Sequence, residues 1–311
     1  MPQASSCVSL PASVQVFQRG WLSSNNILVS DLHHAALIDS GYCIHSAQTV
    51  GLVQSVLADR PLDLLLNTHL HSDHCGGNAA LQAAYPHLQT LIPPGQSSAV
   101  RPWSASELTF DATGQNCPPF GFDGLLMPGS ALQLGGEEWQ VHGAPGHDPH
   151  SVVLFAPASR VLISADALWE NGFGVVFPEL EGEDAFDAVG ATLDLIASLE
   201  PGCVIPGHGK PFADLAGALH TARTRLEYFQ RQPERHRNYA AKVLLKFKLL
   251  ELQTTTVAAL TDWAIATPYL LQMAHSFNAS SQLQALVEDW IAQLVRAGAA
   301  ERDGALLHNR D

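Results

Sequence analysis

Four potential metal ligands occupy six consecutive positions in this sequence. His69, His71, Asp73 and His74 directly follow an apolar stretch at residues 62–66, which predicts a buried strand. In a chain with 15 histidines, chance would produce this spacing on the order of a few times in a thousand. A strand that ends where three imidazoles and a carboxylate begin is typical of a metal centre, and a hydrolytic centre is the first interpretation.

Two glycines, Gly76 and Gly77, follow the histidine run. The alternative interpretation of the run is an exposed polar loop with a bias towards histidine. The glycines favour the metal site, because a chain that carries several ligands must turn sharply and bring its backbone close to the metals.

Three further segments offer ligands where an expected strand gives way to a loop. They contain His147, Asp166 and His208, and Asp166 directly follows the apolar stretch at residues 161–165. A rigid scaffold can present ligands to a shared cleft from such positions. Each would be an ordinary polar residue if it stood alone. Together with the run at 69–74 they bring the potential ligands to seven, which is too many for one zinc ion.

Composition indicates a globular protein in a reducing compartment. Apolar residues make up 46% of the 311 residues, which is enough for a buried core. The N-terminus lacks the features of a signal peptide, and no apolar run approaches the length of about 18 residues that spans a membrane. The five cysteines are odd in number and widely spaced, so we expect a cytoplasmic location without disulfides. Cys75 is expected to be a small buried neighbour of the site.

The net charge of −14 is distributed unevenly along the chain. Residues 1–219 hold 5 Lys and Arg against 21 Asp and Glu, whereas residues 220–311 hold 11 against 9. Bound divalent metals would partly offset the acidic part. This shift coincides with a change to helical periodicity. It predicts a catalytic domain at 1–215 and a smaller domain at 216–311.

The first 215 residues contain two halves with the same order of elements. Strands are expected at 14–17, 26–29 and 35–38, a helix at 48–57, a strand at 62–66, a helix at 78–85 and a strand at 90–92. Residues 102–129 predict a long surface loop with a few short elements. Strands at 139–142, 151–155 and 161–164, a helix at 186–199 and a strand at 203–206 follow. Two such halves stacked sheet on sheet, with helices outside, would form a four-layer αββα sandwich of the α/β class.

The pattern of the remaining residues is mainly helical. Helices are expected at 215–231, 235–252, 257–265 and 281–297, and the last has one buried apolar face. Residues 299–308 are typical of a hairpin with Asp303-Gly304 at its turn. Helices followed by a small hairpin predict a winged-helix-like C-terminal module.

The ligand motifs resemble those of the metallo-β-lactamase superfamily over residues 14–212. The resemblance lies in the type and order of the residues in His69-x-His71-x-Asp73-His74, and in His147, Asp166 and His208. It implies the metallo-β-lactamase fold with a dinuclear metal site at one edge of the αββα sandwich. In that site His69, His71 and His147 would hold one metal, Asp73, His74 and His208 the other, and Asp166 would bridge them. The resemblance also implies that Asp39 supports a ligand imidazole from behind.

Two divalent metal ions are the expected cofactors. Imidazole and carboxylate ligands suit zinc, with iron or manganese as alternatives. Two ions about 3.5 to 4 Å apart can share a water, lower its pKa towards about 7 and hold the resulting hydroxide as the nucleophile. One ion can also polarise the carbonyl or phosphoryl oxygen that gains negative charge. Asp73 is the expected catalytic residue, because it could hydrogen-bond the hydroxide as well as bind a metal.

Three classes of function fit such a centre. The leading hypothesis is a hydrolase of a small-molecule ester, thioester or lactone that resembles the glyoxalase II-like branch, although the glutathione-binding residues of that branch find no match in the C-terminal segment. β-Lactam hydrolysis is disfavoured, because those enzymes typically carry Cys at the position of Asp166 and are exported. The alternatives are a nuclease that acts on RNA and a non-catalytic metal-binding protein of the same fold. The complete ligand set argues against the last.

Two groups of residues outside the motifs bear on this choice. Basic side chains between residues 223 and 248 could bind phosphates: Arg223, Arg225, Arg231, Arg235, Arg237, Lys242, Lys246 and Lys248. The acidic Glu288 and Asp289 on the last helix favour a solvated helical face instead, with the module packed over the rim of the site or in a homodimer contact. Six aromatic residues are the expected walls of a substrate pocket: Trp103, Phe120, Phe122, Trp169, Phe173 and Phe177.

Overall fold

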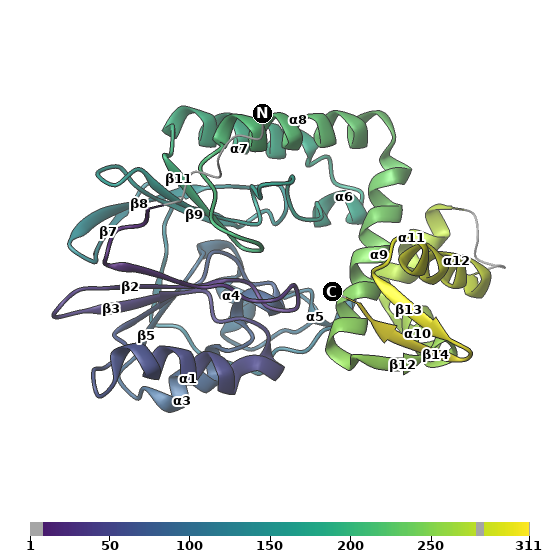
Figure 1. Ribbon diagram of the computed structural model, residues 1–311, viewed down its shortest axis with the longest axis horizontal. Helices are drawn as coiled ribbons and strands as arrows, with labels where there is room; N and C mark the ends of the chain where they lie inside the picture. The colour runs from purple at the N-terminus through teal and green to yellow at the C-terminus, as the bar shows by residue number, and fades with distance from the viewer. Residues whose placement is uncertain (1–8, 278–282, 311) are drawn as a thin grey trace.

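Two stacked sheets with helices on their outer faces form the body of the protein in the computed structural model, which describes residues 9–277 and 283–310 (Figure 1). Residues 1–8, which include Cys7 and most of the segment judged to lack a signal peptide, lie outside the described residues. The same holds for residues 278–282, where the last helix was expected to begin, and for residue 311.

The first sheet has the strand order β1-β2-β3-β4-β5-β6. Its strands are β1 (Val14–Phe17), β2 (Asn26–Ser30), β3 (Ala35–Ile38), β4 (Leu64–Leu66), β5 (Gln89–Ile92) and β6 (Gly124–Leu125). The first three pair antiparallel and β3 to β6 pair in parallel. Parallel neighbours need crossover connections. Helices α1 (Ser46–Leu57) and α3 (Asn78–Ala84) provide two of them, and α2 (Ser72–Cys75) precedes α3.

The second sheet has the strand order β11-β10-β9-β8-β7. Its strands are β7 (Ala131–Leu134), β8 (Glu137–Gly143), β9 (Val152–Ala156), β10 (Val161–Ala165) and β11 (Cys203–Pro206). Only β10 and β11 pair in parallel. The crossover between them contains α6 (Phe177–Glu181) and α7 (Phe186–Leu199).

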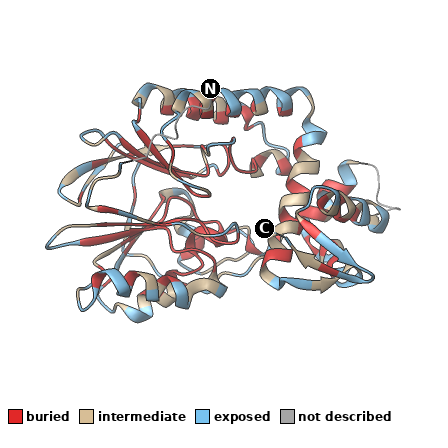
Figure 2. Ribbon diagram, in the orientation of Figure 1, coloured by how far each residue is buried: buried red, intermediate tan, exposed pale blue. Residues whose placement is uncertain are grey.

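Alternation along the central strands sends neighbouring side chains to different layers. On β3 and β4, Leu37 and Leu65 pack with residues of α1 such as Val53, whereas Ile38 and Leu66 pack with residues of the second sheet. Both faces of these strands are therefore buried, as the red central strands in Figure 2 show. A continuous apolar run is the sequence pattern of such a strand. The expected four-layer α/β sandwich is confirmed.

The segment between β5 and β7 is irregular, as expected. It contains only short elements, namely η2 (Pro94–Gln96), α4 (Ser97–Val100), α5 (Phe110–Thr113) and β6, and the short η1 (Cys43–His45) precedes α1. Its aromatic residues pack inward, because Phe110 and Phe120 belong to a buried cluster with Leu70 and Cys75. The loop is thus held against the chain that carries the histidine run.

The C-terminal region is helical and ends in a small sheet. Its elements are α8 (Leu215–Arg231), α9 (Pro233–Leu252), β12 (Thr254–Thr256), α10 (Val257–Ala266), α11 (Pro268–Ser276), α12 (Leu283–Arg296), β13 (Ala300–Asp303) and β14 (Leu306–Asn309). The sheet has the order β12-β14-β13. Helix α8 packs on α7 over the second sheet, and α9 leads to the other C-terminal elements (Figure 1). The domain division at 215 and 216 and the winged-helix-like character stay predictions.

Several expected details of the C-terminal region need correction. The sequence pattern missed α11, which begins with Pro268 in its first turn, and the short strand β12. In the hairpin, Asp303 pairs with Leu306, so the two turn residues are Gly304 and Ala305 rather than Asp303 and Gly304. The positive φ of 57° falls on Gly304, where glycine costs least. Within the described residues, no helix is both long and apolar enough to cross a membrane.

Candidate metal centre

All seven potential ligands are buried near the ends of strands. His69 and His71 follow β4, and Asp73 and His74 lie on α2 directly after them. The others follow strands of the second sheet: His147 after β8, Asp166 after β10 and His208 after β11. Their nitrogen and oxygen atoms form two groups in which all atoms lie within 4.8 Å of one another, namely His69, His71 and His147, and Asp73, His74, Asp166 and His208.

The first group consists of three imidazoles. The Nδ1 of His71 lies 3.1 Å from the Nε2 of His69 and 2.8 Å from the Nε2 of His147. Two nitrogens that bind one zinc ion at 2.0–2.1 Å in tetrahedral geometry lie about 3.4 Å apart. The three nitrogens are therefore placed as ligands of a common ion would be.

The second group combines two imidazoles with two carboxylates. The Nε2 of His208 lies 3.1 Å from the Oδ2 of Asp73. The two oxygens of Asp166 face different imidazoles: Oδ1 lies 3.4 Å from the Nε2 of His74, and Oδ2 lies 3.4 Å from the Nε2 of His147 in the first group. Asp166 is thus the carboxylate that reaches both groups.

Hydrogen bonds behind the imidazoles leave the nitrogens that face the centre available as acceptors. The Nδ1–H of His74 donates to the Oδ2 of Asp39 over 2.7 Å, and the Nδ1–H of His147 donates to the carbonyl of Val175. Because a neutral imidazole with Nδ1–H keeps a lone pair on Nε2, both rings present a metal-binding nitrogen to the centre. The buried Nε2 of His74, which faces the centre, has no hydrogen-bond partner within the described part of the chain.

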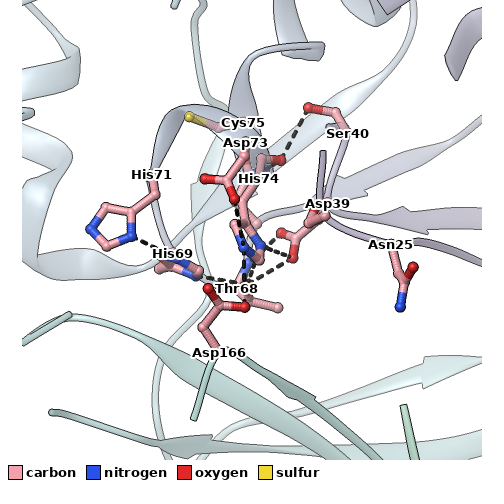
Figure 3. A network of polar contacts seen from close by, with 12 residues as sticks. Asn25, Asp39, Ser40, Thr68, His69, His71, Asp73, His74, Cys75 and Asp166 are labelled. Atoms are coloured by element: carbon pink, nitrogen blue, oxygen red, sulfur yellow. Dashed lines mark hydrogen bonds and ion pairs between the residues drawn. The ribbon is translucent and has the colours of Figure 1, made fainter. Parts of the chain in front are cut away.

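Asp39 holds the histidine run from behind, as Figure 3 shows. Its carboxylate accepts hydrogen bonds from the backbone N–H and from the hydroxyl of Thr68, both over 2.8 Å, in addition to the one from His74. Its backbone has a φ of 58°, in the left-handed region that non-glycine residues seldom occupy. The turn at the end of β3 therefore accepts local strain that places this carboxylate. Asp39 thus makes the expected contact with an imidazole of the histidine run, and its support of a metal ligand stays a prediction.

Burial and neighbouring charges set the protonation of the ligands. Burial, then the neighbouring His147, lowers the pKa of His71 to about 4. Burial also lowers the pKa of His69, so both rings are neutral at pH 7. For His74, burial opposes the charged form, but the carboxylates of Asp39, Asp166 and Asp73 together raise its pKa well above the usual value. A metal must displace a proton there, so metal affinity should rise with pH.

The donor set fits two divalent metal ions. Buried imidazoles, among them the unpartnered Nε2 of His74, and carboxylates that stay ionised are the ligands that zinc and similar ions take. Burial would raise the pKa of Asp166, but His74 and His208 hold it well below its usual range. The residues that the sequence suggested are thus brought together. Their assignment to individual metals stays a proposal.

Replacing Asp39 by Asn should weaken metal binding by 10- to 100-fold. Asparagine can still accept the hydrogen bond from the backbone of Thr68, but it loses the negative charge that faces the Nδ1–H of His74. Competition with a chromogenic chelator measures the affinity. Asp63→Asn is the matched control, because the Asp63 carboxylate accepts from the backbone of Ala35 at the far end of β3. A change of less than threefold in the Asp39 variant would contradict the role of this carboxylate.

A cavity of about 580 Å³ opens beside the two ligand groups. Its lining includes five of the potential ligands, namely His71, Asp73, His147, Asp166 and His208. Of the six aromatic residues expected to form its walls, Trp169 and Phe177 do so. Phe173 is buried in the core with residues of α7. Trp103, Phe120 and Phe122 pack in the cluster that contains Leu70 and Cys75. Phe120 and Phe173 are core residues, and Trp103 and Phe122 are half-buried against the cluster, because their loops fold inward.

Trp21 is the aromatic wall residue that the sequence did not reveal. Its ring stacks on the imidazole of His208, with centroids 5.2 Å apart and planes 11° from parallel, and it also packs edge-on against Trp169. The indole is 56% exposed, so much of its surface is available to a bound molecule. The polar residues that follow it, among them Asn25 and Asn26, are buried, and Asn25 donates to the carbonyls of Pro206 and Gly209 beside His208.

The basic residues of the C-terminal helices do not share one face. Three take part in exposed or half-buried ion pairs: Arg223 with Asp194, Arg231 with Glu227, and Lys248 with Glu251. Three others line the cavity, namely Arg225, Lys242 and Lys246. The pattern therefore differs from the single phosphate-binding stripe that the nuclease hypothesis assumed.

Cys75 is a buried neighbour of the site, as expected. Its Sγ lies 3.5 Å from the carbonyl oxygen of Leu70 and 3.7 Å from the Sγ of Cys117, and it belongs to neither ligand group. Burial raises the pKa of its thiol well above the usual value, which disfavours the thiolate that a metal would bind.

Comparison with known proteins agrees with this site. A sequence profile of the metallo-beta-lactamase superfamily matches residues 19–208, a range that contains all seven ligands. A hydroxyacylglutathione hydrolase of Xanthomonas euvesicatoria is 31% identical over 205 residues, which cover 64% of this chain and 66% of that protein. One of Mesorhizobium japonicum is 31% identical over 37% of each chain. The similarity to these two proteins thus spans less than two thirds of their length.

Solved structures share the fold over nearly the whole chain. A metallo-beta-lactamase family protein of Thermus thermophilus has a TM-score of 0.57 and 20% identity, and the match covers 97% of this chain and all of that one. A beta-lactamase domain protein of Burkholderia ambifaria has a TM-score of 0.58 and 19% identity, with 98% and 97% covered. The C-terminal elements are therefore included in a known arrangement.

Proposed function

This chain belongs to the metallo-beta-lactamase superfamily, and we propose that it is a metal-dependent hydrolase that cleaves a small-molecule ester, thioester or lactone. The observation that carries the proposal is the position of Asp166. Its carboxylate reaches both ligand groups and lines the cavity beside them. Two bound divalent ions would supply an acidified water and would polarise the bond to be cleaved.

The residues of the chain divide the work around that chemistry. The ligands hold the metals, and Asp39 keeps His74 in the tautomer that binds. Asp73 lines the cavity with its Oδ2 near His208, where it can accept a proton from a nucleophilic water in addition to its role as a ligand. Trp21, Trp169 and Phe177 form apolar walls that would orient the substrate and exclude bulk water.

A small molecule fits the cavity better than a nucleic acid does. A volume of about 580 Å³ lies in the range of small-molecule sites. The similarity to hydroxyacylglutathione hydrolases favours a thioester within the proposed class. Zinc is the proposed metal, with iron and manganese as alternatives, because the ligands are imidazoles and carboxylates.

Metal analysis combined with a hydrolysis screen tests the proposal. The purified protein should contain about two equivalents of divalent metal and should hydrolyse at least one acyl thioester, ester or lactone, and chelation should abolish the turnover. Cleavage of RNA without turnover of any ester would favour the nuclease instead. Full metal occupancy without turnover of either kind would favour a binding protein.

A further inference from the structure

The cavity is lined on one side by the potential ligands at the strand ends. One face of α9 forms another wall of it. Seven residues of α9 line the cavity, and all except Leu244 recur at steps of three and four, so that these six share one side of the helix: Tyr239, Lys242, Val243, Lys246, Phe247 and Leu250. This wall mixes apolar groups with cations. Arg225 on α8 and Lys210, two residues after His208, add further positive charge to the lining.

Arg225 lies close to the segment that follows Asp166. Its Nη1 donates to the carbonyl of Phe173 over 3.3 Å, and its guanidinium lies over the ring of Tyr239 at 5.5 Å. Gly172 makes this approach possible, because a Cβ at that position would lie 2.6 Å from the Nη1 of Arg225. The guanidinium is thus held in place beside the segment that follows Asp166 and Trp169.

Lys242 is placed further along the same wall. Its Nζ donates to the amide oxygen of Gln293 on α12 over 3.2 Å. A neutral amide positions the ammonium without neutralising its charge. Lys246 has a different role, since its Nζ donates to the carbonyl of Ala299 and holds the C-terminal hairpin.

The cations of the cavity differ from their neighbours in one respect. Arg223, Arg231 and Lys248 on the same two helices each contact a carboxylate. By contrast, among residues 9–277 and 283–310 no carboxylate lies within ion-pair distance of Arg225, Lys242 or Lys210. In a chain with a net charge of −14, such an arrangement concentrates positive potential in the cavity.

The metal centre does not need these cations for charge balance. Two divalent ions would carry more positive charge than the carboxylates of Asp73 and Asp166 neutralise. Among the described residues that line the cavity, Glu170 is the only carboxylate besides Asp73 and Asp166. The additional cations therefore make the occupied cavity more positive, and an anionic group of the bound molecule would offset that charge.

We infer that Arg225 and Lys242 bind an anionic group of the substrate, a carboxylate or a phosphate, at a distance from the bond that is cleaved. Lys210, which lines the cavity and is exposed, assists the approach of the anion. The inference rests on the proposed function, because it names the class of small molecule that this hydrolase takes. The apolar part of the substrate lies against Trp21, Trp169 and Phe177 while the anion lies against α9.

Three benzoyl thioesters of similar size test the inference on the metal-loaded protein. Their thiols are 3-mercaptopropionate, its neutral amide and 2-mercaptoethyl phosphate. The wild-type protein should prefer an anionic thioester to the amide by at least about tenfold in kcat/KM, since a hydrogen bond to a charged group has this effect. The Lys242→Gln variant should lose most of that preference, because its KM should rise more for the anionic thioesters than for the amide. The better of the two anionic thioesters identifies carboxylate or phosphate as the group bound.

Arg235→Gln is the matched control. Arg235 lies on α9 but is exposed, and its Nε contacts the side chain of Gln232. This variant removes one positive charge from the same helix without altering the cavity wall, so it should keep the preference for the anion. Arg225→Gln gives a second measurement of the wall, and circular dichroism shows whether it is folded. Equal loss of preference in Arg235→Gln and Lys242→Gln would mean that overall charge, rather than the wall, attracts the anion, and would overturn the inference.

A binding measurement separates this inference from the proposed function. Benzyl thioethers of the same three thiols cannot be hydrolysed, and calorimetry gives their affinities. Tighter binding of an anionic thioether that depends on Lys242 would support the inference even if no thioester is cleaved, which would count against the hydrolase alone. Turnover of the neutral thioester without any preference for an anion, in catalysis or in binding, would overturn the inference and leave the hydrolase standing.

Discussion

Replacing Asp166 by Asn should lower hydrolysis by at least about a thousandfold, which corresponds to about 4 kcal/mol of transition-state stabilisation. Each oxygen of this carboxylate lies 3.4 Å from an imidazole nitrogen, one in each ligand group. Asparagine keeps the shape but replaces one oxygen by an N–H donor and removes the negative charge. It therefore cannot hold two cations together.

The metal content of this variant is the more direct measurement. We expect it to fall from about two equivalents to one or less, because the second group would keep only one carboxylate, Asp73. Elemental analysis after dialysis measures the content, and turnover of the best thioester measures the activity.

Asp123→Asn is the matched control for Asp166. The Asp123 carboxylate accepts a hydrogen bond from the backbone of Thr90 on β5, and it belongs to neither ligand group. Asparagine can accept the same hydrogen bond, so this variant should keep its metals and lose less than tenfold of the activity. Two equivalents of metal and near-normal turnover in the Asp166 variant would rule out the bridging role.

Replacing Gly76 by Ala should lower the free energy of unfolding by about 3 kcal/mol and should also displace the metal ligands on α2. A Cβ at Gly76 would lie 2.5 Å from the carbonyl oxygen of Ser72 and 2.6 Å from the backbone nitrogen of Cys43. Both are backbone atoms, which cannot move aside by changing a rotamer. Urea unfolding monitored by fluorescence measures the loss of stability, and metal titration measures the effect on the site.

Gly51→Ala provides a control with the opposite sign. Gly51 lies within α1, and apart from its chain neighbours and the backbone of the helix, no atom of the described residues lies within 4 Å of a Cβ built there. Alanine in the interior of a helix is more stable than glycine by about 0.5 to 1 kcal/mol, so this variant should be slightly more stable than the wild-type protein. An unchanged unfolding midpoint for Gly76→Ala would show that the backbone around α2 yields more easily than its contacts indicate.

The body of the fold was largely predictable because its signals are local. Apolar runs marked the central strands, and β11 and α7 occur at the residues expected for them. Helix α8 also has its expected ends. The missed elements are short or weakly patterned. In α11, for example, Pro268 follows Thr267 directly after α10, and only nine residues remain for a helical period to show.

The ligands were predictable for a different reason. Their side-chain types are dictated by metal chemistry, and four of the seven are close neighbours in sequence. The supporting role of Asp39 followed from the family resemblance, and its hydrogen bond with His74 is the contact that this prediction requires. Trp21 carries no such signal, because a single tryptophan before a strand is more often part of a core.

The sequence by itself determined the donor set and the layers that hold it, since both depend on residue type and on short-range periodicity. The tertiary structure decided which aromatic and basic side chains face the cavity. Trp169 lines the cavity whereas Trp103 packs in the cluster with Phe120, and Lys242 lines the cavity whereas Lys248 pairs with Glu251. Residue type and short-range periodicity do not distinguish the members of these pairs. Packing between segments far apart in the sequence gives them different surroundings, and the sequence pattern carries no signal for that packing.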